Sequence, residues 1–137
     1  MSKFIIGVDV GGTNIKLGLM SPQGVIVDRS HLNTRTFVLS KNKLIEAILK
    51  AIASLIQKNN LKNQDITGIG FGLPGLIDFK KGSVLFLPNI PGWKNVPLKK
   101  IVEDKLHIPT FVDNDVNVIA LGEWFFGAGK GFSNLIC

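Results

Sequence analysis

Cysteine and long hydrophobic runs are what this sequence most clearly lacks. Its 137 residues contain one cysteine, Cys137 at the last position, which cannot build an internal disulfide framework or a cysteine-based metal site. No stretch approaches the roughly 20 apolar residues that a membrane-spanning helix needs. The first ten residues also lack the charged region and cleavage site of a signal peptide. We therefore expect a reduced, cytoplasmic protein with no membrane partner.

Charge is also sparse, at 19% of residues, although the balance is basic: 16 Lys and Arg against 10 Asp and Glu give a net charge of +6. The lysines are scattered without a run of five and without interleaved aromatic residues, so we expect them to be solvated surface. No helix-turn-helix or zinc-finger pattern stands before the first motif, and we expect no nucleic-acid partner. With 45% hydrophobic residues, the chain can bury the core of one domain.

The order of hydrophobic patterns predicts an α/β fold. Three apolar runs separated by tight turns predict an antiparallel meander of strands over residues 3–10, 14–20 and 25–32. The following patterns predict a helix over 41–59 with Ser40 or Asn42 as its cap, then a strand over 66–71 and a loop around residue 89. They also predict a short helix ending at 106, a strand over 110–112 and a helix ending at 126. We expect Trp124, Phe125 and Phe126 in that last helix to pack in the core. This order indicates a mixed five-stranded sheet with an antiparallel three-strand meander and flanking helices.

The first candidate site motif is Asp9-Val10-Gly11-Gly12-Thr13. A strand delivers Asp9 to its end, where a carboxylate can hold Mg²⁺ through water. The two glycines let phosphate oxygens approach backbone N–H groups, and Thr13 adds a hydroxyl. An ordinary glycine-rich hairpin turn would have the same letters. The motif is neither a Walker A loop, which needs Gly-Lys-Ser/Thr, nor the dinucleotide fingerprint, which opens a helix.

Three further segments carry polar or glycine-rich signals. Gly70–Gly75 follows a buried strand and could admit a ligand against the backbone, or form a turn with unusual dihedral angles. Asn89–Trp93 is either a ligand-binding loop or a surface loop anchored by its tryptophan. Asp113–Asp115 opens a helix, so its carboxylates could simply cap that helix. Alternatively, Asp115 could be the general base of a phosphoryl transfer to an alcohol, with Asn114 binding a polyol.

Taken together, these four segments resemble the N-terminal half of a ROK-family sugar kinase; ROK stands for repressor, open reading frame, kinase. In the family's order they read DVGGTNIKLGL from Asp9, GFGLPGLID from Gly70, NIPGW from Asn89 and DNDVNVIALGEWFFGAGKG from Asp113. Each motif alone is weak, but four in one order are specific and cover nearly the whole chain. The resemblance implies the actin/hexokinase-like ATPase fold, which is ribonuclease H-like, and a glucokinase-like activity.

The resemblance also implies a role for each matching residue. Asp115 would be the catalytic base that accepts the proton of the sugar hydroxyl. The sugar would contact Gly75, Asn89 and Asn114. The ATP phosphates would lie against Gly11, Gly12, Thr13 and Lys16, although strand alternation could direct Lys16 elsewhere, and Asp9 would lie near Mg²⁺. Glucose is the expected sugar, while fructose, N-acetylglucosamine and N-acetylmannosamine stay open.

The chain also departs from the family pattern. The family's second lobe brings another glycine-rich phosphate loop, more sugar ligands, the adenosine pocket and a Cys/His motif for structural zinc, and none of these is among the 137 residues. We therefore expect residues 1–131 to be the N-terminal lobe, residues 132–137 to begin the first strand of the second lobe, and the isolated chain to be nearly inactive. Uncovered apolar surface, including Phe132, Leu135 and Ile136, could pair two copies as a homodimer.

Two other functions stay open. A sugar-sensing repressor of the ROK type would carry a DNA-binding helix-turn-helix before the phosphate motif, whereas here Met1 stands close before Asp9. A non-catalytic actin-like domain would bind partners instead of a sugar. Sugar binding that Asn114→Ala abolishes would argue against that second alternative.

Overall fold

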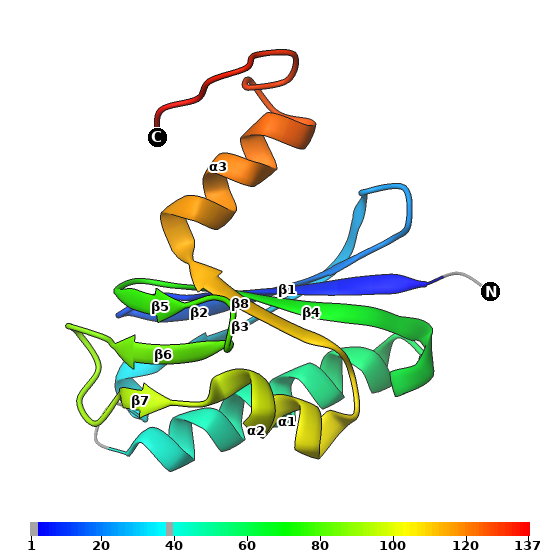
Figure 1. Ribbon diagram of the computed structural model, residues 1–137. Helices are drawn as coiled ribbons and strands as arrows, with labels where there is room; N and C mark the ends of the chain where they lie inside the picture. The colour runs from blue at the N-terminus through cyan, green and yellow to red at the C-terminus, as the bar shows by residue number, and fades with distance from the viewer. Residues whose placement is uncertain (1–2, 38–39) are drawn as a thin grey trace.

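A five-stranded sheet forms the centre of the chain (Figure 1). The structure is a computed structural model and describes residues 3–37 and 40–137. The strands lie in the order β3-β2-β1-β4-β8. Their bounds are β1 Phe4–Val10, β2 Asn14–Met20, β3 Ile26–Asn33, β4 Ile66–Leu73 and β8 Thr110–Asn114.

The pairing direction divides this sheet into two halves. β1, β2 and β3 pair antiparallel, whereas β1 pairs with β4, and β4 with β8, in parallel. The parallel neighbours need long crossovers because a tight turn can join only antiparallel strands. The predicted mixed sheet with its antiparallel meander is therefore confirmed, and the predicted strand ends differ from the observed ones by at most two residues.

Helices α1 (Lys41–Lys58) and α2 (Leu98–Leu106) cover one face of the sheet, below it in Figure 1. α1 begins at the predicted cap, where the Ser40 side chain accepts a hydrogen bond from the Lys43 amide. Its buried residues recur at helical spacing: Leu44, Ile45, Ile48, Ala51, Ile52, Leu55 and Ile56. They meet every second side chain of the central strands, so this face of the sheet holds the core. No helix in the described ranges is long and apolar enough to cross a membrane.

The opposite face of the sheet is open. Helix α3 (Asp115–Phe126) starts at the end of β8 and rises from this side (Figure 1), and none of its residues is buried. Trp124, Phe125 and Phe126 are 46%, 59% and 77% exposed, so the prediction that they belong to the core is wrong for this chain. Their composition is that of a buried helix, but the described residues leave each of them largely exposed.

A second, smaller sheet lies beside the carboxyl ends of β1 and β4 and was not predicted (Figure 1). Its strands are β5 Leu76–Asp78, β6 Ser83–Phe86 and β7 Lys94–Val96, all antiparallel. The segment after Gly75 was predicted to be a loop because strands of three or four residues are too short to show an alternating pattern. Trp93, at 1% exposed, anchors this region in the core.

The residues after α3 fold back against its last turn. The amides of Gly127 and Gly129 donate to the Glu123 carbonyl, and the Glu123 carboxylate accepts from the Ala128 amide at 2.8 Å. The Trp124 indole donates to the Phe132 carbonyl at 3.0 Å. Residues 132–137 form neither helix nor strand here, and their place at the start of a second lobe stays a prediction.

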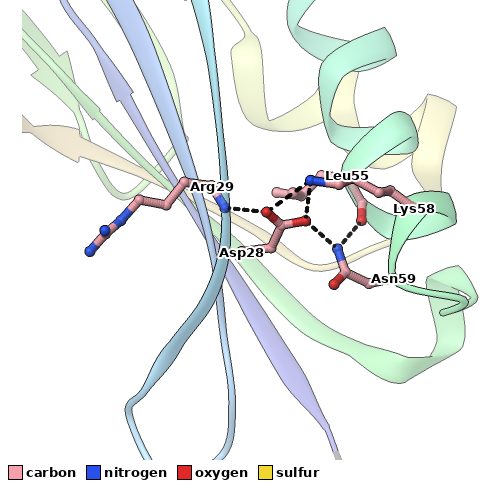
Figure 2. Close-up of polar contacts among 5 residues, drawn as sticks. All are labelled: Asp28, Arg29, Leu55, Lys58 and Asn59. Atoms are coloured by element: carbon pink, nitrogen blue, oxygen red, sulfur yellow. Dashed lines mark hydrogen bonds and ion pairs between the residues drawn. The ribbon is translucent and has the colours of Figure 1, made fainter.

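A polar cluster ties the edge strand β3 to the end of α1 (Figure 2). The Asp28 carboxylate accepts hydrogen bonds from the Asn59 amide at 2.9 Å, Lys58 Nζ at 3.1 Å and the Arg29 backbone at 2.8 Å. Asn59 Nδ2 also donates to the Leu55 carbonyl, an orphan acceptor of the last helical turn. The hydrogen bond from Asn59, followed by that from Lys58, holds the pKa of the Asp28 carboxyl below its ordinary value.

We expect Asp28→Asn to lower the melting temperature at neutral pH and to remove part of the acid sensitivity of the fold. A carboxyl whose pKa is lower in the folded state stabilises that state above its unfolded pKa of about 4. This stabilisation is lost as the pH falls through the folded pKa. Thermal unfolding followed by circular dichroism between neutral pH and pH values below about 4 measures both effects.

Asp104→Asn is the matched control for this variant. Asp104 forms an exposed ion pair with Lys100 at 2.8 Å on the surface of α2, and such a pair contributes little to stability. The control should therefore stay near the wild-type melting temperature. Equal losses for Asp28→Asn and Asp104→Asn would contradict a special role for the β3–α1 cluster.

Candidate active site

The candidate site lies where the parallel strands β1, β4 and β8 end (Figure 1). In the register of the sheet, Asp9 is paired with Gly72, and Gly72 with Asp113. These residues therefore form one row across neighbouring strands on the open face. In open α/β sheets, ligands bind outside the carboxyl ends of the strands, and a hollow of about 970 Å³ extends from this row over the open face.

The turn between β1 and β2, residues 11–13, is named the phosphate turn for the role predicted of it. It is held by its own backbone and by a buried threonine. The Gly11 amide donates to the Asn14 carbonyl at 3.0 Å, and a Cβ on Gly11 would lie only 2.7 Å from that same oxygen. Thr34, fully buried, donates its hydroxyl to the Gly11 carbonyl at 2.8 Å and its amide to the Thr13 carbonyl at 2.9 Å. The Gly11 amide thus has a partner within the turn, and the phosphate contacts predicted for Gly12 and Thr13 stay predictions.

Asp9 and Lys16 point to the open face together. They are register partners, and their neighbours Val8, Val10 and Leu17 point into the core. Strand alternation therefore directs Lys16 toward the hollow rather than away from it, and both side chains line it.

Asp9 has an environment that fits a water-mediated Mg²⁺. It forms no ion pair with any residue in the described ranges, so its carboxylate is free to accept hydrogen bonds from a hydrated cation. Those same ranges hold no group of three or more His, Cys, Asp or Glu side chains that could bind a metal directly. Mg²⁺ keeps several waters and prefers one or two carboxylates plus phosphate oxygens, and this donor set fits Asp9 beside the phosphate turn.

The glycine-rich segment after β4 has a conformation that requires glycine. Gly75 has a φ of +116°, and a Cβ there would overlap the carbonyl oxygen of Phe86. Its own carbonyl accepts a hydrogen bond from Asn114 Nδ2 at 3.0 Å. This bond joins two of the predicted sugar-binding residues, one from the turn after β4 and one from the end of β8.

Asn89 lies against the phosphate turn. A Cβ built on Gly12 would be 3.5 Å from the Asn89 Cβ, so the two residues are in close proximity. The loop around Asn89 is held in place by the buried side chains of Ile90 and Trp93, while Asn89 itself is exposed. Of the predicted sugar-binding residues, Asn89 is thus the one placed beside the predicted phosphate-binding residues.

Asp115 is the first residue of α3 and is half-buried. Asn114 caps the helix: its Oδ1 accepts from the Val116 amide at 3.0 Å. The Asp115 carboxylate accepts from the same amide at 2.9 Å, so it also serves as a cap in this structure. Asp113 orients its neighbours by accepting from the Asn114 amide and from Asn117 Nδ2. All the predicted site residues therefore gather at one edge of the sheet, and their ligand contacts stay predictions.

Two residues that matter in this region, Thr34 and Gly72, were not singled out by the sequence patterns. Thr34 stands after the end of β3 in a polar stretch, and nothing in that stretch distinguishes the one threonine that is buried. Gly72 was seen only as part of a glycine-rich run, whereas in the structure it lies directly under Asp115: a Cβ on Gly72 would be 3.4 Å from the Asp115 Cα. Its register pairing with Asp9 and Asp113 singles it out, and this pairing is visible only in the structure.

Comparison with known proteins identifies the family of the chain. The family model described as the ROK family matches residues 5–137. The glucokinase of Streptomyces coelicolor is 39% identical over 132 residues, which are 96% of this chain and 39% of that protein. A xylose repressor of Caldicellulosiruptor bescii is 36% identical over 132 residues, which are 96% of this chain and 33% of the repressor.

A solved structure has the same fold. The ROK family glucokinase from Streptomyces griseus, crystallised in complex with glucose and AMPPNP, superposes with a TM-score of 0.79 at 36% identity. The match covers 93% of this chain and 38% of that one. The chain therefore spans about two-fifths or less of the length of these relatives.

We expect Thr34→Val to destabilise the chain by about 1 kcal/mol, because it removes a buried hydrogen bond without changing the shape of the side chain. The Gly11 carbonyl would lose its hydroxyl partner, and the phosphate turn would become more mobile. Urea unfolding gives the free energy, and amide hydrogen exchange at Gly12 and Thr13 reports the turn. Thr36→Val, at an exposed position nearby, is the control; a loss as large as that of Thr34→Val would contradict the assignment.

Proposed function

The chain belongs to the ROK family, and from this premise we propose that it is the N-terminal lobe of an ATP-dependent hexose kinase that acts on glucose. The observation that carries the proposal is the convergence of four separate sequence segments. At the carboxyl ends of β1, β4 and β8, Gly12 lies next to Asn89. The Gly75 carbonyl accepts a hydrogen bond from Asn114. Gly72 lies under Asp115. The glucose and AMPPNP named for the Streptomyces griseus glucokinase support the choice of sugar and nucleotide.

In the proposed reaction, a sugar hydroxyl oxygen attacks the γ-phosphorus of ATP. The new O–P bond forms as the bond from the γ-phosphorus to the β,γ-bridging oxygen breaks, and ADP leaves with that oxygen. Asp115 accepts the proton of the attacking hydroxyl and orients that oxygen toward the phosphorus. The phosphorylated sugar and ADP are the products.

Residues of the chain orient both substrates and place charged groups near the phosphates. The amides of Gly12 and Thr13, together with Lys16, bind the phosphate oxygens and stabilise the charge of the transferring group. Mg²⁺, held through water by Asp9, would neutralise phosphate charge. Asn89, Asn114 and the Gly75 backbone hold the sugar, and the bond between Asn114 and Gly75 fixes the amide so that its remaining groups can face hydroxyls.

A sugar-binding repressor is the second candidate, because a xylose repressor matches the chain over the same length at 36% identity. Asp115 favours the kinase: a sugar sensor needs hydrogen bonds to the sugar but no group that accepts its hydroxyl proton. Phosphorylation assays and sugar-binding assays separate the two, since a sensor would bind the sugar without converting it.

We expect the 137-residue chain alone to convert glucose far more slowly than a kinase that carries both lobes. The relatives are more than twice as long, and the site here is open on the side away from the sheet. Joining residues 1–137 to the remainder of the Streptomyces coelicolor glucokinase should restore phosphorylation. A coupled ADP-release assay with glucose and MgATP measures both proteins. Phosphorylation by the isolated chain at the rate of the joined protein would contradict the dependence on a second lobe.

We expect Asp115→Asn in the joined protein to abolish turnover and to leave much of the glucose affinity, because only the proton acceptor is removed. Asn114→Ala should instead weaken glucose binding. Turnover is measured by ADP release, and glucose affinity by calorimetry with each variant.

Asn114→Asp is the control for a structural effect of Asn114→Ala. An aspartate keeps an oxygen for the Val116 amide, so the helix cap survives, but it cannot donate to the Gly75 carbonyl. Both Asn114 variants should lose glucose affinity if the amide binds the sugar. Wild-type affinity in Asn114→Asp would limit the role of Asn114 to capping α3.

A further inference from the structure

Gly72 has a special place among the glycines of the open face. It is paired with Asp9 on β1 and with Asp113 on β8, and the first turn of α3 lies above it. A Cβ built on Gly72 would be 3.4 Å from the Asp115 Cα, 3.7 Å from the Asp115 Cβ and 3.7 Å from the Val118 Cβ. The first turn of α3 thus leaves room for a methyl group above Gly72 but not for a larger side chain.

Two other glycines on the same face have no part of α3 near them. Gly7 and Gly70 are register partners one row further from the strand ends. A Cβ on either of them would meet no described atom within 4 Å. Close approach to α3 is therefore a property of Gly72 rather than of the glycine-rich face as a whole.

We propose that Gly72 is a positioning residue that sets the place of Asp115 and keeps the space between Asp9 and Asp115 open for the transferring phosphoryl group. This inference rests on the proposed function, since it concerns the proposed base. All these residues line the same hollow. With no side chain at position 72, the start of α3 can lie within about one methyl group of β4, and the hollow keeps its depth at the point where donor and acceptor must meet.

The distances predict a graded response to side-chain size. An alanine methyl would touch Asp115 at ordinary contact distance, so it should change the surroundings of Asp115 with little displacement. A valine adds two γ-carbons, which would push the first turn of α3 away and fill the floor of the hollow. A displacement of a reacting group by about 1 Å can cost on the order of 100-fold in rate.

The first test uses the 137-residue chain and does not require activity. We expect Gly72→Ala to move the backbone amide signals of Asp115 and Val118, and the side-chain amide signal of Asn114, in nitrogen–proton correlation spectra. Gly7→Ala adds the same methyl to the same face and should leave these three signals in place. Unmoved signals in Gly72→Ala, or equal shifts in Gly7→Ala, would overturn the proposal.

The second test measures turnover in the protein joined to the Streptomyces coelicolor remainder. Gly72→Val should lower kcat by about 100-fold while the KM for glucose changes little, and Gly72→Ala should give a smaller loss of kcat. Gly7→Ala should keep the parent kcat. A rise in KM with unchanged kcat would place the effect of Gly72 on sugar binding and overturn its role in setting Asp115.

The two tests separate this inference from the proposed function. If the parent joined protein does not phosphorylate any hexose, the proposed kinase function is refuted. The spectra of the 137-residue chain still decide whether Gly72 sets the position of Asp115. If the parent is active and Gly72→Val is as active as Gly7→Ala, the kinase function stands and the positioning role is refuted. Well-dispersed spectra of each variant establish that it folds.

Discussion

The hydrogen-bonded register of three parallel strands is the constraint on which the candidate site depends. Because β1, β4 and β8 run in one direction, their carboxyl ends meet at one edge of the sheet. The register then places Asp9, Gly72 and Asp113 in one row, although they are far apart in the sequence. A slip of one residue in any of these strands would turn its site residue to the core face. The buried side chains of the other face, such as Val8, Phe71 and Val112, prevent that slip.

One face of the sheet therefore holds the core, and the other holds the candidate site. The face under α1 and α2 carries the apolar side chains that fold the chain, and the polar cluster of Asp28 fastens its edge strand from the same side (Figure 2). The opposite face carries glycines, charged residues, exposed apolar side chains such as Phe111 and the start of α3. Since the site residues are exposed or half-buried, most substitutions there remove little core packing. Thr34 is the exception, because it is buried and holds the phosphate turn.

Periodicity and caps in the sequence predicted the central sheet, α1 and α3, because long amphipathic patterns and residues such as Ser40 and Asn114 act locally. The four motifs named residues that the structure brings together at one edge of the sheet, and the roles of these residues stay predictions. Three features could not be found this way. The strands of the second sheet are too short for a pattern, the exposure of Phe126 depends on what covers α3, and the burial of Thr34 depends on contacts with Gly11, which is distant in the sequence.

The charged residues that line the hollow are divided by sign between its two sides, and this division matters for the proposed reaction. Lys16 and, on β3, His31 and Arg29 line one side, whereas Asp9 and Asp115 line the other. Neighbouring strands are about 4.8 Å apart, so phosphate oxygens near Lys16 would also lie near Asp9. Like charges at that distance repel unless a cation lies between them. Under the proposed function, Mg²⁺ beside Asp9 would relieve this repulsion, whereas Asp115, above Gly72 on the next strand, would accept the hydroxyl proton.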